Sequence, residues 1–204
     1  MRNEIAGSSR YASAALPPPR VRSSDEALIG KVAAGNRLAM QVLFARHQTR
    51  IYRYVLRLVG NNALAEDLTS EVFLSAWRHA NRFEGRSTVT TWLLAIARYK
   101  ALGELRRRSE PSSEEAGAEL VDPADDPEVA FEIKHRGEIL RRCLMRLSQE
   151  HREIIDLVYY HEKSVHEVAG IVGIPGNTVK TRMFYARRKL SELLEAEGVV
   201  GACS

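Results

Sequence analysis

The chain has 204 residues, 45% of them hydrophobic, a formal net charge of +4 and a pI of about 9.2. This length accommodates one large globular domain or two small ones, and the composition excludes a largely disordered or fibrous protein. The first 24 residues hold four arginines and no continuous apolar core, and the longest apolar run is Trp92–Ala97, so neither a signal peptide nor a membrane span is expected.

The charge is unevenly distributed along the chain. Residues 109–128 contain eight acidic residues and no Lys or Arg, which gives this segment a charge of −8 and leaves +12 on the remainder. A remainder with that charge is suited to a polyanionic partner such as nucleic acid.

The N-terminal half is predicted to be helical after a disordered tail. Residues 1–24 are rich in Ser, Ala, Pro and Arg, a composition that favours disorder. Ser24, followed by Asp25 and Glu26, is typical of a helix start. Apolar residues at helical spacing then predict helix to about residue 108, interrupted at 60–62 (Gly-Asn-Asn) and by a loop at 81–87.

The C-terminal half is predicted to be a second helical domain. The acidic segment 109–130 is expected to be a flexible linker, and helix resumes near Glu128. Ser148 is expected to cap a helix over 149–160, and Gly198 ends the pattern within a tail at 197–204. Because no useful strand-type alternation occurs, the predicted fold is all-α, with two small helical domains at 25–108 and 131–196.

Residues 164–190 (SVHEVAGIVGIPGNTVKTRMFYARRKL) have the pattern of a helix-turn-helix. Ala169 allows a close approach of the second helix, Gly173 suits a turn that needs a positive φ, and Pro175 blocks continuation of the first helix. Asn177 or Thr178 is predicted to cap the second helix. A purely structural helical hairpin is the alternative, but it does not require so polar and basic a second helix.

The second helix supplies the candidate DNA contacts, and Val179 and Met183 on its apolar side are expected in the core. Its first residues can reach base edges and its later cations can meet phosphates. The candidate base readers are Asn177, Thr178, Thr181 and Arg182, and the candidate phosphate contacts are Lys180, Arg187, Arg188 and Lys189.

Two segments of the first domain carry further candidate sites. Asp67, Ser70, Glu71 and Leu74 share one helical face, where an apolar anchor among carboxylates suits a protein interface; an ordinary solvated face is the alternative. The loop 81–87 (NRFEGRS) combines amide, guanidinium, aromatic and hydroxyl groups beside Gly85, a composition that can accept an unstacked base.

The second helix, in the run IPGNTVKTRMFYARRKL, resembles the promoter-recognising end of bacterial sigma factors of the extracytoplasmic-function (ECF) group of the sigma-70 family. Independently, AEDLTSEVFLSAWRHANRFEGRSTVTTWLLAIARYKALGELRRR resembles that family's other main domain. The resemblance covers roughly residues 25–108 and 131–195. It implies a cytoplasmic, non-enzymatic initiation factor without a cofactor, which binds core RNA polymerase and promoter DNA in a stress response.

The resemblance also implies roles for the first-domain residues. The face at residues 67–74 would dock on the coiled coil of the largest polymerase subunit, with the polymerase flap as a further contact. Ser70 stands where Gln is usual, Val89 where an aromatic is usual and Tyr99 where Asn is usual. An anti-sigma factor is implied as a partner. The melted −10 element would be held by Asn81, Arg82, Phe83, Arg86, Ser87, Arg98, Lys100, Arg106 and Arg107, while the helix-turn-helix holds the −35 duplex.

The two cysteines form no disulfide framework or metal-ligand cluster. Cys143 lies beside Arg141, Arg142 and Arg146, which favour a thiolate if the side chain is exposed, and Cys203 is on the C-terminal tail. A redox switch is therefore one hypothesis, and a buried structural Cys143 with an incidental Cys203 is the other.

Two other functions compete with a sigma factor. A stand-alone helix-turn-helix regulator would need a receiver or ligand domain, for which residues 25–108 offer no strands and no phosphoacceptor setting. An enzyme has little support, because the six His are scattered and no metal-ligand spacing, nucleophile elbow or phosphate-binding Gly loop occurs.

Overall fold

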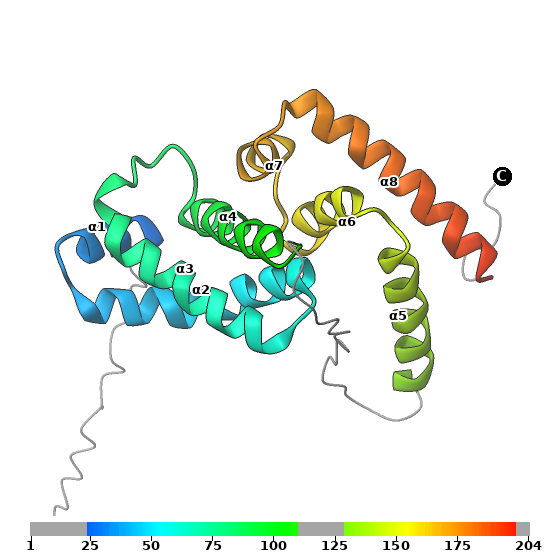
Figure 1. The fold of residues 1–204 in the computed structure, drawn as a ribbon, viewed down its shortest axis with the longest axis horizontal. Helices are drawn as coiled ribbons and strands as arrows, with labels where there is room; N and C mark the ends of the chain where they lie inside the picture. Colours follow the sequence, from blue (N-terminus) through cyan, green and yellow to red (C-terminus); the bar gives the residue numbers. More distant parts are fainter. Residues whose placement is uncertain (1–23, 110–128, 199–204) are drawn as a thin grey trace, which may run out of the picture.

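The computed structural model describes residues 24–109 and 129–198, and it contains helices and no strands over these residues (Figure 1). The prediction of an all-α fold is confirmed. The predicted N-terminal tail, most of the acidic linker and Cys203 lie outside the described residues. The elements are α1 (Asp25–Ala33), α2 (Arg37–Val59), α3 (Asn62–His79), η1 (Ala80–Arg82), α4 (Val89–Ser109), α5 (Val129–Met145), α6 (Gln149–Ile155), η2 (Asp156–Tyr160), α7 (Val165–Val172) and α8 (Gly176–Ala196).

Helices α1–α4 form the first unit around one apolar core. Ser24 caps α1 as predicted, its Oγ accepting a hydrogen bond from the Ala27 N–H at 3.1 Å. Gly60, with φ of 66°, ends α2 at the predicted break. The core residues include Leu43, Ile51, Val55, Val72, Phe73, Leu93 and Leu94.

The sequence predicted continuous helix from residue 25 to residue 59, but a turn separates α1 from α2. Gly35 adopts φ of 82°, and Asn36 caps α2 by accepting a hydrogen bond from the Ala39 N–H at 3.0 Å. The Gly-Asn pair is the local signal for this turn, because Gly tolerates the positive φ and Asn offers a capping oxygen. The turn lets α1 fold back across α2 and bury Leu28, Ile29 and Val32.

Helices α5–α8 form the second unit, which contains the helix-turn-helix (Figure 1). Ser148 caps α6 as predicted, and Ser164 and Glu167 form a reciprocal capping box at the start of α7. Gly173 ends α7 with φ of 73°, which confirms the predicted turn. Along α8, Val179 and Met183 are buried, as predicted.

The predicted cap of α8 was wrong. The helix begins at Gly176 after Pro175, and no side chain caps it. Pro175 has φ of −58° and lacks an N–H, so it delivers the chain into the helix without a capping oxygen. Asn177 and Thr178 are consequently within the first turn of α8 rather than before it.

The end of the predicted helix 149–160 is not α-helical. Residues Asp156–Tyr160 (η2) form a π-helical turn, in which the His161 N–H donates to the Asp156 carbonyl at 3.1 Å. This wider turn follows α6 directly and leads to the helix-turn-helix.

The two units pack against each other, with α7 lying across α4 (Figure 1). Side chains of α2 and α4 also form hydrogen bonds with side chains of α6 and η2, and the bonded residues are separated by 55 or 99 positions in the sequence. The described part of the chain has no helix long and apolar enough to cross a membrane.

Candidate nucleic-acid and polymerase interfaces

Helix α8 presents a continuous exposed stripe opposite its buried side. Asn177, Thr181, Phe184 and Arg188 are exposed at i, i+4, i+7 and i+11 spacing, which puts them on one face. The opposite face packs into the unit through Val179, Met183, Ala186 and Leu193. The stripe therefore combines an amide, a hydroxyl, an aromatic ring and a guanidinium on a face that no other helix of residues 24–109 and 129–198 covers.

Phe184 and Tyr185 were missed as functional candidates. Phe184 is 62% exposed, an unusual position for so large an apolar side chain, and its ring lies edge-on to Tyr185 at 5.5 Å. The sequence signal was available, because position 184 is seven residues after Asn177 and three after Thr181. An apolar side chain at that place belongs to the exposed face rather than to the buried one.

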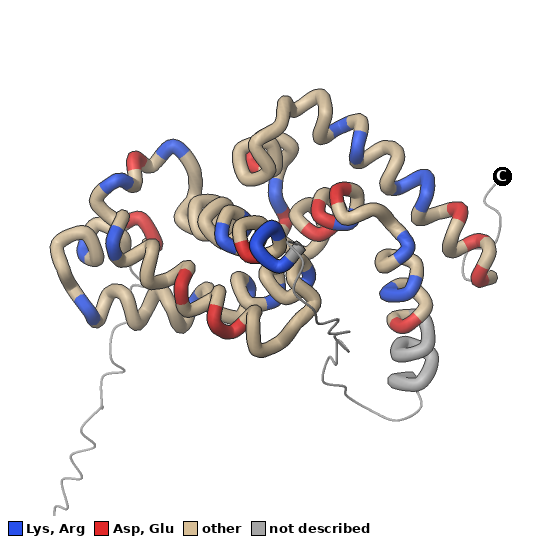
Figure 2. The backbone as a smooth tube through the Cα atoms, in the orientation of Figure 1, with Lys and Arg blue, Asp and Glu red and all other residues tan. Residues whose placement is uncertain are grey.

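The cations of α8 lie along its middle, and Glu192 and Glu195 follow toward its C-terminal end (Figure 2). Arg188 and Lys189 both donate to the Glu192 carboxylate, at 3.2 and 3.4 Å, and these hydrogen bonds lower the pKa of Glu192. All three side chains are well exposed, so these ion pairs are weak and leave Arg188 and Lys189 accessible from solvent.

The remaining predicted DNA contacts are arranged differently. Arg182 is paired with Glu150 of α6 at 3.0 Å, and the Arg187 guanidinium lies 5.8 Å from the centre of the Tyr159 ring. Lys180 is exposed and Thr178 is half-buried. The Thr181 hydroxyl donates to the Asn177 carbonyl at 3.0 Å, within the helix. Arg182 and Arg187 are thus turned toward α6 and η2.

The α3 face contains the predicted polymerase-binding residues. Asp67, Ser70 and Glu71 are exposed, and Leu74 is 47% exposed. Beside Leu74 lies an open apolar groove of about 400 Å³, to which α2 contributes residues that were not predicted to belong to this face. The groove is lined by Met40, Gln41, Phe44, Phe73, Leu74 and Trp77.

The predicted base-capturing loop is only partly a loop. Asn81 and Arg82 are exposed on the short η1 turn, and Gly85 has φ of 71° in the loop that follows. Phe83 is half-buried and its ring lies 5.3 Å from that of Trp92. Arg86 is paired with Glu84 at 2.7 Å, and the half-buried Ser87 hydroxyl donates to the Thr88 carbonyl.

The predicted cations of α4 do not form one surface. Arg98 points to the second unit and donates to Glu153, while Lys100 donates to Glu71 of α3 at 2.9 Å. Arg106 and Arg107 are exposed at the end of α4, where Arg107 donates to Glu104 and lowers the pKa of that carboxyl group. Arg106 and Arg107 therefore lie together at the end of α4, whereas Arg98 contacts α6 and Lys100 contacts α3.

Cys143 is fully buried in the second unit. The redox hypothesis required an exposed thiol, and this conformation does not meet that condition. Across residues 24–109 and 129–198, no group of three or more His, Cys, Asp or Glu could hold a metal ion.

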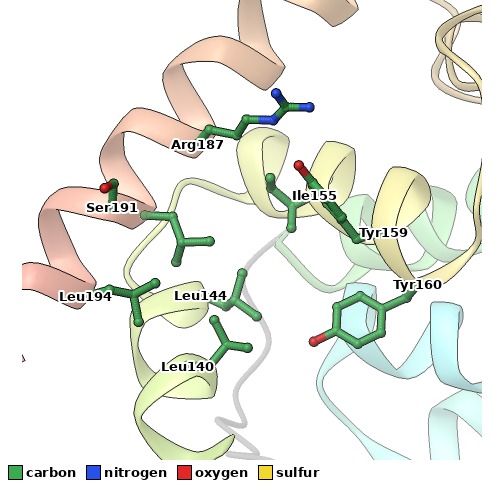
Figure 3. A pocket seen from close by; sticks show the side chains of 9 residues that line it. Leu140, Leu144, Ile155, Tyr159, Tyr160, Arg187, Ser191 and Leu194 are labelled. Atoms are coloured by element: carbon green, nitrogen blue, oxygen red, sulfur yellow. The ribbon is translucent and has the colours of Figure 1, made fainter. Parts of the chain in front are cut away.

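A second apolar groove lies between α5, η2 and α8 (Figure 3). It has a volume of about 380 Å³, and its mouth carries the exposed Tyr159 and Tyr160. Its remaining lining is Leu140, Leu144, Ile155, Arg187, Leu190, Ser191 and Leu194.

Comparison with known proteins matches both units. The family model of sigma-70 region 2 matches residues 43–110, and that of sigma-70 region 4 matches residues 143–192. The ECF RNA polymerase sigma factor SigK of Mycobacterium tuberculosis (strain ATCC 25618 / H37Rv) is 31% identical over 184 residues, covering 87% of this chain and 97% of SigK.

Two solved structures share the fold at a TM-score of 0.62 and 24% identity. One is CnrH in complex with the cytosolic domain of CnrY, matched over 85% of this chain and 99% of that chain. The other is the sigma factor RpoE of Bartonella quintana in complex with the anti-sigma factor NepR, matched over 76% of this chain and 96% of that chain.

These matches show that the chain belongs to the ECF group of sigma-70-family RNA polymerase sigma factors. Its function is to bind RNA polymerase and direct promoter-specific initiation of transcription. It is a non-enzymatic factor, since the polymerase carries out the chemistry.

Proposed function

We propose that this sigma factor reads the −35 duplex through the exposed stripe of α8. The observation that carries the proposal is the exposed row of Asn177, Thr181, Phe184 and Arg188 on a helix positioned by the Gly173 turn. An α-helix fits the major groove of B-form DNA, where amide and hydroxyl groups read base edges. Arg188 and its neighbour Lys189, with Lys180 about two turns earlier on α8, then meet the phosphates.

Phe184 supplies the apolar part of this readout. The C5-methyl group of thymine is the apolar feature of the major groove, and Phe is one of the side chains that contact it. The ring is held out from the helix, against Tyr185, so it needs no rearrangement to reach a base.

The polymerase docks on the α3 face in this proposal. Leu74 and the groove beside it provide the apolar centre, and Asp67 and Glu71 provide a charged rim. Glu71 would exchange its contact with Lys100 for a contact with the polymerase, which leaves Lys100 available to DNA.

The melted −10 strand is assigned to the exposed Asn81, Arg82 and Arg86, with Arg106 and Arg107 on its backbone. Capture of an unstacked base there would offset the few kcal/mol that its unstacking costs. Phe83 packs against Trp92, so in this arrangement the pair supports the loop from beneath.

The factor is assigned to the cytoplasm, to a stress response and to control by an anti-sigma factor. Two similar structures are described as complexes, of RpoE with the anti-sigma factor NepR and of CnrH with the cytosolic domain of CnrY, which supports such a partner.

Run-off transcription with purified core polymerase on a promoter library tests the function. Core-dependent initiation from a subset of templates is expected, and the combined variant Asn177→Ala/Arg188→Ala should lose it while remaining folded. DNA binding with full specificity in the absence of core, and no initiation with it, would favour a stand-alone regulator instead.

A further inference from the structure

The apolar groove between α5, η2 and α8 has no role in the proposed function (Figure 3). Its volume of about 380 Å³ is within the range of small-molecule sites, which are mostly apolar and carry a few polar groups that fix the ligand. The aliphatic part of its lining is Leu140, Leu144, Ile155, Leu190 and Leu194. An apolar chain that covers these side chains removes apolar surface from water on both partners, which favours binding.

Arg187 is the only charged residue among the described residues that line this groove. It was predicted to contact a phosphate, but its guanidinium lies at the groove, 5.8 Å from the centre of the Tyr159 ring. It has no carboxylate partner within the described part of the chain, whereas Arg182 and Arg188 on the same helix each pair with a glutamate. A cation without a counter-charge at an apolar surface favours an anionic ligand over a neutral or cationic one.

The π-helical turn η2 supplies two hydroxyl groups to the same groove. In a turn closed by i→i+5 hydrogen bonds, side chains four and five residues apart share one side, so Tyr159 and Tyr160 both line the groove with Ile155. Figure 3 shows the Tyr159 hydroxyl on the Arg187 side of the groove and the Tyr160 hydroxyl directed toward Leu144. Neither hydroxyl has a hydrogen-bond partner among residues 24–109 and 129–198, so both can donate to a ligand.

A carboxylate attached to one alkyl chain matches these groups together. Its oxygens accept hydrogen bonds from the Arg187 guanidinium and from the Tyr159 hydroxyl, and its chain covers the leucine side chains. Its single negative charge balances one guanidinium. A phosphate monoester carries up to about two negative charges and would leave part of its charge uncompensated beside an apolar surface.

We propose that this groove is a binding site for a single-chain amphipathic carboxylic acid, in which Arg187 binds the carboxylate and the leucine side chains contact the alkyl chain. Arg187, Leu190 and Leu194 recur at i, i+3 and i+7 spacing, on a different face of α8 from the exposed stripe that is assigned to DNA. Binding of the acid therefore does not depend on the proposed DNA contacts.

Titration calorimetry on the full chain tests the ligand class, with decanoate as the probe below its micelle-forming concentration. Decanol and decyltrimethylammonium have the same chain with a neutral and a cationic head group, and acetate has the carboxylate without the chain. Decanoate is expected to bind at least about tenfold more tightly than decanol, because hydrogen bonds to a charged group are the strong ones. Decyltrimethylammonium should bind more weakly than decanol, and acetate should show no measurable binding.

A substitution at Arg187 tests the place of binding. Arg187→Gln should lower the affinity for decanoate about tenfold and leave that for decanol unchanged. Arg141→Gln removes a cation from an exposed position on α5 that does not line the groove, and it should bind decanoate like the wild type. In NMR spectra of the wild-type chain, the shifts caused by decanoate should centre on Leu144, Tyr160 and Leu190.

Three results would overturn the proposal. The first is equal affinity of the three ten-carbon probes, which would mean that the groove binds apolar chains regardless of charge. The second is unchanged decanoate affinity in folded Arg187→Gln. The third is the absence of decanoate binding to the folded wild-type chain, which would leave the groove to a protein segment rather than to a small acid.

Discussion

Phe184 is the single residue at which the structure adds most to the proposed −35 contact. Its ring is exposed on the stripe that also carries Asn177 and Thr181, so a base contact needs no unfolding or rotation of α8. If hydrogen bonds alone recognised the −35 bases, Asn177 and Thr181 would be the main base contacts. In the proposed −35 contact, the apolar ring of Phe184 would distinguish thymine from the other bases through its methyl group.

We expect Phe184→Ala to weaken specific −35 binding by about 1–3 kcal/mol without changing binding to unrelated DNA. The matched test replaces each −35 thymine in turn by deoxyuridine, which removes only the methyl group. At one position this replacement should weaken the wild-type protein and leave Phe184→Ala unaffected. Equal sensitivity of both proteins at every position would contradict the contact, and Tyr99→Ala, which removes a 78% exposed ring from α4, is the control for general loss of aromatic surface.

Glu167 makes the stability of the second unit depend on acid pH. Burial raises its pKa, but hydrogen bonds from Thr91, Ser164 and Lys163 outweigh that effect and bring the pKa to about 2, below the ordinary value of 4.5. A carboxyl group with a depressed folded-state pKa stabilises the fold above its unfolded-state pKa. That contribution is fully present above about pH 4.5 and is lost as pH falls toward 2.

Urea unfolding at several pH values measures this effect. Glu167→Gln is expected to lower the free energy of unfolding by about 2 kcal/mol at pH 7 and to lose less stability than the wild type between pH 4.5 and 2. The exposed Glu138→Gln provides the comparison, with little change at either pH. Parallel pH profiles for the wild type and Glu167→Gln would show that Glu167 is not the responsible group.

At the scale of elements, the turn between α7 and α8 sets the direction of α8, the helix that we propose reads the −35 duplex. Gly173 adopts φ of 73°, in the left-handed region that a residue with a Cβ occupies only under strain. Gly170 lies three residues earlier within α7, and a Cβ there would meet nothing within 4 Å. The same alanine substitution therefore tests a left-handed position at Gly173 and an ordinary helical position at Gly170.

Alanine at these two positions should change stability in opposite directions. Gly173→Ala is expected to destabilise the protein by about 1 kcal/mol because of the strained φ, whereas Gly170→Ala should stabilise it by about 0.5–1 kcal/mol as a better helix former. Thermal unfolding followed by circular dichroism measures both. A stabilising Gly173→Ala would mean that the turn does not hold this conformation in solution.

Helix α3 is the element that we assign to polymerase docking. Leu74→Ala should weaken binding to core polymerase by about 1–2 kcal/mol, because it removes the exposed apolar anchor of the groove, and it should leave thermal stability nearly unchanged. Leu38→Ala removes an equally large side chain that is 71% exposed on α2 and does not line the groove. Equal losses of core affinity in the two variants would argue against a specific role for α3.

At the scale of the whole molecule, the buried polar contacts that Glu153 and Asp156 make with α2 and α4 should couple the unfolding of the two units. Wild-type protein is expected to unfold in one calorimetric transition, because residues of both units share the buried contacts around Glu153. Glu153→Gln/Asp156→Asn should separate that transition into two, with the less stable unit melting several degrees earlier. A single unshifted transition in the variant would show that the units are coupled by something else.

Sequence periodicity predicted the helices and the helix-turn-helix because these features depend on residues only a few positions apart. Gly173, Ser148 and Ser24 each carry their signal locally, and the structure confirms all three. The polar contact between the two units could not be predicted in this way, since Tyr54 and Glu153 lie 99 positions apart and each is an ordinary residue of its own helix. The assignment of Arg98 to DNA followed family resemblance and did not foresee its pairing with Glu153.

The orientation of the elements after the π-helical turn at Asp156–Tyr160 depends more on how many residues the turn contains than on which residues they are. Removing one residue from it would restore ordinary α-helical winding, and every later side chain would then rotate by about 100° relative to α6. Asp156 and Tyr160, which flank Arg57 from the two ends of the turn, would no longer face the same guanidinium. A one-residue deletion here would therefore reorient α7 and α8 relative to α6, whereas a side-chain substitution within the turn would leave their orientation unchanged.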